Sequence, residues 1–175
     1  PLVMYYSGMR PEEVAGLAAD DIVDDGMGGY YFDVIDRPDK EDFELFEGFE
    51  DDLSEVATPL PGQLDSRTLK NGASVRRVPV AQQLIDLGLL RYRDWVVAKR
   101  ERALFPTLTK DNQGKLSGAF GKFFGRYKTE LGFQDTRKTL YSFRHCMKDF
   151  LERARVPSKV LKRTIGATGP NGSSV

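Results

Sequence analysis

The segment covering residues 141–154 constrains the fold most, because its side chains divide between two faces of a single helix. With helical geometry, Tyr141, Arg144 and His145 lie at positions i, i+3 and i+4 on one face of one turn. A largely separate apolar stripe, which would face a core, consists of Phe143, Met147, Phe150 and Leu151. A plainer interpretation makes Arg144 a surface arginine and His145 a hydrogen-bonded core histidine. The other segments of the chain are needed to choose between the functional and the plainer interpretation.

Length and composition indicate one globular domain. The 175 residues match the usual size of a domain, and a hydrophobic content of 40% supports a core. No apolar run approaches the roughly 20 residues of a transmembrane helix, so we expect no membrane partner. The chain opens on Pro1 inside an apolar segment, which predicts a fragment of a longer protein. A single cysteine, Cys146, excludes an internal disulfide and a zinc cluster and predicts a reducing, intracellular setting.

A net charge of zero hides a strong asymmetry along the chain. Residues 1–35 carry one basic and seven acidic side chains, and residues 36–65 carry two and eleven. Residues 66–175 carry 23 basic and eight acidic side chains. This imbalance favours a polyanionic partner for the C-terminal two thirds of the chain, while the acidic part faces elsewhere or competes for the same surface.

The first residues predict two helices separated by a tight turn. Ser7 and Gly8 are a stop signal, and Pro11 suits the first position of a new helix, whose positive end is complemented by the next two glutamates. Arg10 then stands just before a helix N-terminus, where its guanidinium and the backbone N–H groups can converge on one anion. The alternative is an ordinary exposed arginine at a turn.

Two regions of strand follow, on either side of an acidic segment. Aromatic and β-branched residues bounded by glycines predict a strand over residues 30–35, with a short one near residues 22–23. Residues 36–65 are acidic and irregular, and we expect them to form an insertion in a hairpin. It would be a solvated loop with a short helix, although a partner-binding role is open.

Asn71 and Gly72 predict a hairpin between strands at residues 64–69 and 75–80. Lys70 lies near its tip, where a lysine can reach into a groove or donate a proton. The plainer alternative is that it keeps the strand edge soluble.

The C-terminal half is predicted to be helical. Helices are expected across residues 81–97 with a split near Gly88, over residues 115–131, and from Pro157 to a stop at Gly166. In the second of these, we expect an inward aromatic stripe that forms core in preference to a base-stacking platform, with members Leu116, Phe120, Phe123, Phe124 and Tyr127. The helix at residues 141–154 and the helix that follows it could also form a helix-turn-helix DNA-binding motif, with Lys159, Lys162 and Arg163 exposed.

Four segments, in this order, resemble the catalytic domain of the tyrosine recombinase, or phage integrase, family. They are Ser7-Gly8-Met9-Arg10-Pro11-Glu12-Glu13, Leu69-Lys70 through Arg77-Val78-Pro79, Leu104-Phe105-Pro106, and residues 141–149. The resemblance covers the whole chain, residues 1–175, apart from the acidic insertion. It implies an α+β, mainly α-helical fold in which a small antiparallel sheet of about three strands packs beside a helical core.

Family membership would imply site-specific DNA recombination through a 3′-phosphotyrosyl intermediate, with no metal or cofactor. By this resemblance Arg10 and Arg144 grip the scissile phosphate, Lys70 protonates the leaving 5′-oxygen, and Glu13 and His145 support the site. The implied partners are double-stranded DNA attachment sites and further copies of the chain in a tetramer on DNA. The implied location is cytoplasmic, in a bacterial or phage setting.

Three departures from the family pattern leave two functions open. Tyr141 stands where the family has His or Lys, and a phenol is a poor base at neutral pH. Ala167 replaces a phosphate-contacting His or Trp, and the nucleophilic tyrosine is expected a few residues past Val175. The chain is then either the truncated domain of a working integrase or a degenerate, recombinase-like DNA-binding protein without turnover.

Overall fold

The computed structural model describes residues 1–35 and 75–166. The predicted acidic insertion at residues 36–65, the predicted strand at residues 64–69, Lys70 and Ala167 lie outside the described residues. Helices and short strands follow one another in the order α1 (Leu2–Ser7), α2 (Pro11–Ala15), η1 (Ala19–Asp21), β1 (Ile22–Asp24), β2 (Tyr30–Val34), β3 (Arg76–Pro79), α3 (Gln82–Asp86), α4 (Leu89–Ala98), α5 (Leu116–Glu130), α6 (Ser142–Arg153) and α7 (Ser158–Ile165).

The described strands form one antiparallel sheet in the order β1-β2-β3, which confirms the predicted α+β class with a small three-stranded sheet. Phe32 of the central strand pairs with Ile22 on one side and Val78 on the other. All three are buried, so one face of the sheet belongs to the core. The predicted strands at residues 22–23, 30–35 and 75–80 are therefore present, and β3 pairs with β2.

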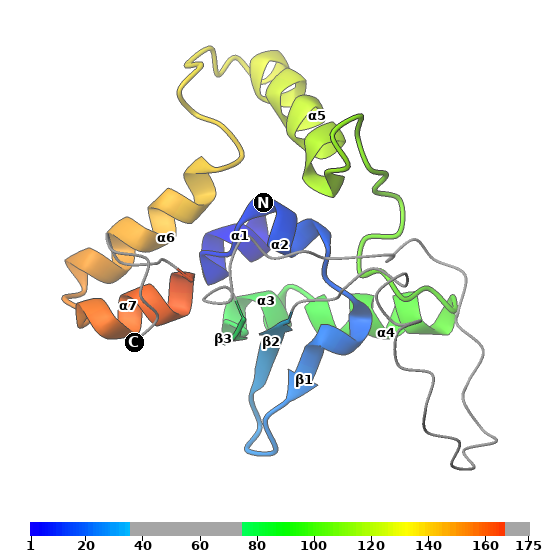
Figure 1. The fold of residues 1–175 in the computed structure, drawn as a ribbon, viewed down its shortest axis with the longest axis vertical. Helices are drawn as coiled ribbons and strands as arrows, with labels where there is room; N and C mark the ends of the chain where they lie inside the picture. Colours follow the sequence, from blue (N-terminus) through cyan, green and yellow to red (C-terminus); the bar gives the residue numbers. More distant parts are fainter. Residues whose placement is uncertain (36–74, 167–175) are drawn as a thin grey trace, which may run out of the picture.

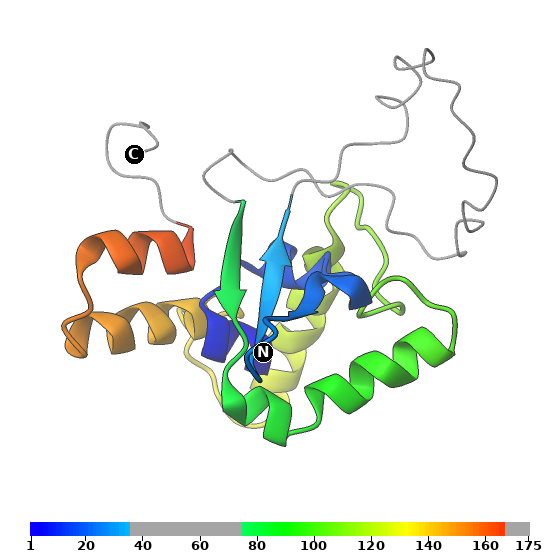
Figure 2. The same cartoon turned by 90° about the horizontal axis from the view of Figure 1, so that it is seen from below.

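The helices lie beside the sheet and beyond one end of it, and the turn between β1 and β2 projects away from them (Figure 1). α6 packs against α1, and α7 packs against both α6 and β3. α5 packs against α2 and leads away from the sheet, whereas α3 and α4 run along the other side of the molecule (Figures 1 and 2). This arrangement brings the ends of α1, α2, β3, α6 and α7 into one region.

The predicted helix boundaries agree with the structure to within about two residues. Gly88 adopts a left-handed conformation with φ 92° and separates α3 from α4, as its glycine allows. The helix expected from Tyr141 begins at Ser142, with Tyr141 as its N-cap residue. Gly166 ends α7 with φ 64°, which confirms the predicted stop.

The predicted apolar faces of α5 and α6 are partly wrong. Leu116, at the start of α5, is buried, but Phe123 and Tyr127 are 50% and 47% exposed. Phe120 and Phe124 do pack against the core, and Phe124 contacts Phe143. Phe123 and Tyr127 instead stack on each other at the surface, because α5 leads away from the sheet (Figure 1). On α6, Phe150 is likewise exposed, at 64%, because α1 and α7 cover other parts of that helix.

Glu12 of α2 ties α5 to the rest of the protein, a role that its sequence context does not reveal. Its two carboxylate oxygens accept hydrogen bonds from the backbone N–H groups of Leu116 and Ser117, at 2.8 and 3.0 Å. These N–H groups belong to the first turn of α5 and have no partner within the helix. The carboxylate therefore caps α5 from a different helix and also complements its macrodipole.

The change Glu12→Ala is expected to lower the free energy of unfolding by about 1–2 kcal/mol, because two helix N–H groups lose their acceptor. Urea denaturation monitored by circular dichroism measures this difference. Asp149→Ala removes the same charge from an exposed position of α6 and serves as the control. Equal stability of the two variants would contradict the capping role.

Candidate anion-binding site

Arg10 is placed by the turn between α1 and α2. Gly8 ends α1 in a left-handed conformation, with φ 66°, and the chain then extends through Arg10, the N-cap residue of α2. The backbone N–H of Arg10 donates to Glu13 Oε2 at 2.7 Å. Its side chain donates from Nη1 to Glu13 Oε1 and from Nη2 to the carbonyl of Gly166, both at 2.7 Å. Arg10 thus joins the start of α2 to the end of α7.

Glu13 is the carboxylate at the centre of the cluster. Its Oε1 accepts hydrogen bonds from Arg10 Nη1 and from Arg76 Nη1, while its Oε2 accepts from the Arg10 backbone and from Arg76 Nη2. Burial alone would raise the pKa of Glu13, but the hydrogen bonds and charges of Arg76 and Arg10 outweigh burial and lower that pKa below its ordinary value. Glu13 is consequently a charged, fully bonded carboxylate and not a general base.

Arg144 enters the cluster from the first turn of α6. It is buried, at 7% exposure, and its Nη1 donates to the carbonyl of Gly8 at the end of α1. Within the described residues, Arg144 makes no ion pair. Burial lowers the pKa of its guanidinium, and the charges of Arg10 and Arg76 also lower it, while Tyr141 and Glu13 act in the opposite direction. The predicted pair Arg10 and Arg144 therefore lies in one electrostatic environment.

Backbone carbonyls of two helix ends complete the described cluster. Arg144 donates a hydrogen bond to the carbonyl of Gly8 at the end of α1. At the end of α7, Arg76 donates to the carbonyl of Thr164 and Arg10 donates to that of Gly166. Carbonyls at helix C-termini lack partners within the helix and carry the negative end of its macrodipole, so they attract cations. The described groups combine three guanidinium ions with one carboxylate, which leaves an excess of positive charge.

Glycine is required where α7 meets the cluster. A Cβ atom on Gly166 would lie 2.6 Å from Arg76 Nη1, closer than such contacts allow. A Cβ atom on Gly8 would lie 3.1 Å from a side-chain carbon of Ile165. Both residues also have positive φ, so each allows a helix to end directly against its neighbours.

Tyr141 and His145 lie at the edge of this cluster. The Tyr141 ring is 5.9 Å from the Arg144 guanidinium carbon and 5.1 Å from the His145 ring, edge to face. Both side chains are exposed. In the described part of the chain, the side chain of His145 makes no hydrogen bond to the arginines, so its described contact is with Tyr141.

A groove of about 450 Å³ adjoins the site. Pro11, which follows Arg10, and Tyr141, three residues before Arg144, line one part of it, and α5 contributes Gly121 and Gly125. Lys128 also lines the groove, but its ammonium group donates to the carbonyls of Asp135 and Lys138. None of the residues that line the groove belongs to the arginine cluster itself.

Arg76 is the member of the cluster that the sequence analysis missed. It occupies the first position of β3, and the side chains of that strand alternate between buried and exposed. Because Val78 and Val80 are apolar, period-two alternation could have placed Arg76 on the same inward face. An arginine on the core face of a strand requires a buried acceptor, and Glu13 provides it.

Across residues 1–35 and 75–166, no cluster of three or more His, Cys, Asp and Glu side chains could hold a metal ion. No helix in that part of the chain has the length and apolarity needed to cross a membrane. Comparisons with protein-family models, with curated proteins and with solved structures found no match.

Proposed function

We propose that this protein is a DNA-binding domain of the tyrosine recombinase class, in which Arg10 and Arg144 hold one phosphodiester of a duplex. The observation that carries the proposal is the charge of Arg144, which is buried beside Arg10 and makes no ion pair within the described residues. Burying an uncompensated ion costs on the order of several kcal/mol, and an anion bound from outside offsets that cost. A phosphodiester is suitable because guanidinium groups match its paired oxygens.

The proposed reaction is strand cleavage and rejoining at a duplex attachment site. A tyrosine hydroxyl loses its proton to solvent as its oxygen bonds to phosphorus, the bond from phosphorus to the 5′-oxygen breaks, and Lys70 supplies the proton that the 5′-oxygen takes up. Arg10 and Arg144 stabilise the charge that develops on the non-bridging oxygens. A second strand then attacks the phosphotyrosyl link, in a tetramer of the chain on DNA, and no metal or cofactor takes part.

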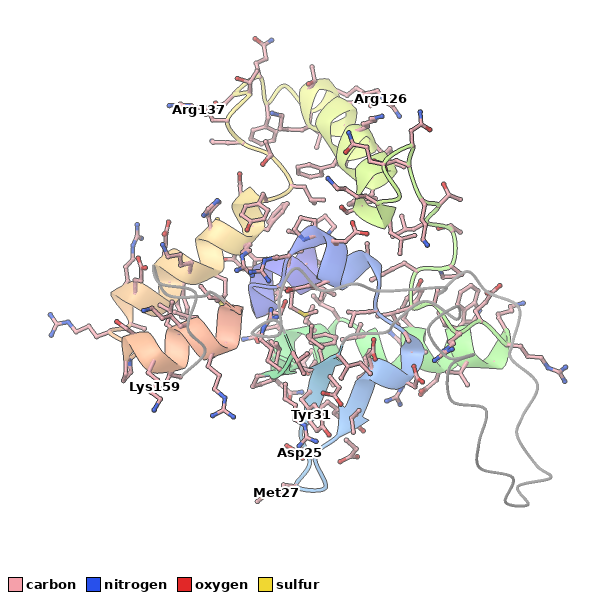
Figure 3. The ribbon with its side chains drawn as sticks, in the orientation of Figure 1. Asp25, Met27, Tyr31, Arg126, Arg137 and Lys159 are labelled. Carbon is pink, nitrogen blue, oxygen red and sulfur yellow. The ribbon has the colours of Figure 1, made fainter. Side chains whose placement is uncertain are left out.

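The distribution of charged side chains supports a nucleic-acid partner. Arg126 and Arg137 project at one end of the molecule, and Lys159 projects from α7 (Figure 3). Asp25 and Met27 mark the turn between β1 and β2, at the opposite end from Arg126 and Arg137 (Figure 3). The acidic turn therefore lies away from Arg126, whereas Arg137 at that end is paired with Asp135 at 3.0 Å, so Arg126 and Lys159 are the residues that support a polyanionic partner.

The combined change Arg10→Ala and Arg144→Ala is expected to weaken duplex binding by on the order of 100-fold and to reduce the salt slope by about two, the value for two lost phosphate contacts. Fluorescence anisotropy with a labelled duplex, measured between 50 and 200 mM salt, tests both quantities.

Two other double variants distinguish the loss of this phosphate site from a general loss of positive surface charge. Arg91→Ala with Arg100→Ala removes the same charge from exposed positions and should have a much smaller effect. Lys159→Ala with Lys162→Ala tests the helix-turn-helix alternative. Unchanged affinity in the Arg10 and Arg144 variant, or a larger loss in the α7 variant, would contradict the proposed phosphate site.

A second candidate is a degenerate recombinase-like domain that binds DNA without cleaving it. Tyr141 favours this candidate, because it is 38% exposed beside the Arg144 guanidinium at the position where the family has His or Lys. A phenol can donate a hydrogen bond to a phosphate oxygen but does not readily accept a proton at neutral pH. The two candidates share the arginine site and differ only in turnover.

A further inference from the structure

We propose that residues 153–163, which we call the basic segment, form a second contact to the DNA backbone that is independent of base sequence. The segment comprises the end of α6, the turn that follows it and most of α7. This inference rests on the proposed function for its ligand, because it concerns the same polyanion. It uses no residue of the arginine cluster, so the two sites can be tested separately.

The basic segment concentrates unpaired positive charge. It contains five cationic side chains and no acidic one, and the five are Arg153, Arg155, Lys159, Lys162 and Arg163. All five are exposed, and in the described parts of the chain none of them forms an ion pair. The preceding acidic residue, Glu152, pairs with Lys148 at 3.4 Å. Like charges held this close repel one another, and a bound polyanion relieves the repulsion.

The turn of the basic segment lies at the outer edge of the molecule. α6 begins and α7 ends at the arginine cluster, and the turn that connects them lies at the opposite end of both helices (Figures 1 and 2). Lys159 projects from α7 on this side (Figure 3). The helical rise from Arg144 to Arg155 is about 16 Å. Sites separated by such a distance contribute to binding almost additively.

The turn holds Arg155 in a backbone conformation that favours glycine. The N–H of Arg155 donates to the carbonyl of Glu152 at 3.0 Å. The N–H of Val156 donates to the carbonyl of Leu151 at 3.1 Å. These two bonds form a Schellman motif, in which the left-handed residue is usually glycine. Arg155 occupies that position with φ 54°.

The end of α5 shows the same motif with glycine. Gly132 has φ 83°, its N–H donates to the carbonyl of Thr129, and the N–H of Phe133 donates to that of Lys128. A residue with a Cβ atom costs free energy in this conformation, whereas glycine does not. Strained residues of this kind concentrate at functional sites. Together with the four unpaired cations around it, the strain at Arg155 indicates that its guanidinium serves binding and not the turn.

Duplex DNA is the polyanion that best fits this distribution of charge. It carries one negative charge per about 1.7 Å of helix axis, so several cations along one segment can contact phosphates at the same time. The arginines of the segment can each donate two parallel hydrogen bonds to a phosphate. Such contacts carry no sequence information, so the basic segment adds affinity for any duplex, whereas a helix-turn-helix motif favours particular bases.

The test is binding of Arg155→Gly to two duplexes of unrelated sequence, measured by fluorescence anisotropy between 50 and 200 mM salt. We expect the affinity to fall about threefold for both duplexes and the salt slope to fall by about one, as for one lost phosphate contact. The same change removes the backbone strain, so the melting temperature should rise by about 2–4 °C. A variant that is more stable but binds more weakly identifies the guanidinium as the cause.

Arg100→Gly is the matched control. Arg100 occupies the same position of a Schellman motif at the end of α4, with φ 59°, and its N–H donates to the carbonyl of Val97 at 2.8 Å. The change removes one exposed charge and the same strain, so the melting temperature should rise equally while the salt slope stays unchanged. Arg155→Lys retains the charge and should bind nearly as well as the wild type.

A triple variant, Arg153→Ala, Arg155→Gly and Lys159→Ala, should bind about 30-fold more weakly and lower the salt slope by about three. The same factor should be lost when these changes are added to Arg10→Ala with Arg144→Ala, because the two sites are separate. A loss in the triple variant without a loss in the Arg10 and Arg144 variant would overturn the proposed phosphate site alone. The reverse result would overturn the basic segment alone.

Two further outcomes would also overturn the inference. If the triple variant binds DNA normally but loses affinity for polyglutamate, the basic segment contacts an acidic protein and not a nucleic acid. If the wild type binds neither duplex, both the basic segment and the proposed function are contradicted.

Discussion

A chain extended past Val175 and incubated with a nicked duplex attachment site is expected to form a protein–DNA adduct that survives denaturation. The nick lets the short cleaved strand diffuse away, so the phosphotyrosyl product accumulates. The expectation depends on the resemblance to recombinases, which puts the nucleophilic tyrosine a few residues beyond Val175. Denaturing gel electrophoresis with end-labelled DNA measures the adduct.

Variants of the extended chain assign the roles. Replacing the downstream tyrosine with phenylalanine should abolish the adduct, whereas Tyr141→Phe should still form it, because Tyr141 is not the proposed nucleophile. Loss of Arg144 should slow adduct formation by on the order of 1,000-fold, as when other enzymes lose an arginine that stabilises phosphoryl transfer. Tight DNA binding without any adduct would instead support the degenerate domain.

The second large effect is expected for Glu13→Gln, which should lower the free energy of unfolding at pH 7 by about 3 kcal/mol or more. The reason is that the change leaves two guanidinium groups, Arg10 and Arg76, without the carboxylate that they share. Glu152→Gln is the control, because its carboxylate is 52% exposed and pairs with Lys148 at 3.4 Å on the surface of α6. That change should cost less than about 0.5 kcal/mol.

The stability should also depend on pH through Glu13. The pKa of Glu13 in the folded protein lies below its ordinary value of 4.5, so the folded state binds a proton less readily than the unfolded state. The resulting stabilisation is complete above pH 4.5 or so and is lost as the pH falls through the folded-state pKa. Urea midpoints between pH 3 and pH 7 should show this loss in the wild type and a weaker dependence in Glu13→Gln. Parallel curves for both proteins would contradict it.

The helices and strands were largely predictable, because the residues that mark them act through their own backbone conformation. Gly8, Pro11, Gly88 and Gly166 mark ends of helices, and each does so through its own backbone conformation. Aromatic and β-branched residues likewise predict β2 correctly. Such signals do not depend on what the rest of the chain does, so they can be recognised in sequence.

Packing and partners were less predictable because they depend on distant residues. The period of α5 predicts a helix but not how far the core extends, so Phe123 and Tyr127 were wrongly assigned to it. Glu12 has the sequence position of an ordinary first-turn glutamate of α2, yet its carboxylate caps α5. The roles predicted for Arg10, Glu13 and Arg144 stay predictions, although the structure brings their side chains into one cluster.

The hydrogen bonds of the cluster connect residues from nearly the whole described chain. Arg10 donates a hydrogen bond to the carbonyl of Gly166, 156 residues away in the chain, and Arg144 donates one to the carbonyl of Gly8, 136 residues away. During synthesis, a nascent chain therefore carries Arg10 long before Gly166 and cannot assemble the cluster until the end of α7 has left the ribosome. The cluster is therefore completed late in folding, and we expect chains that end before α7 to lack the proposed anion site.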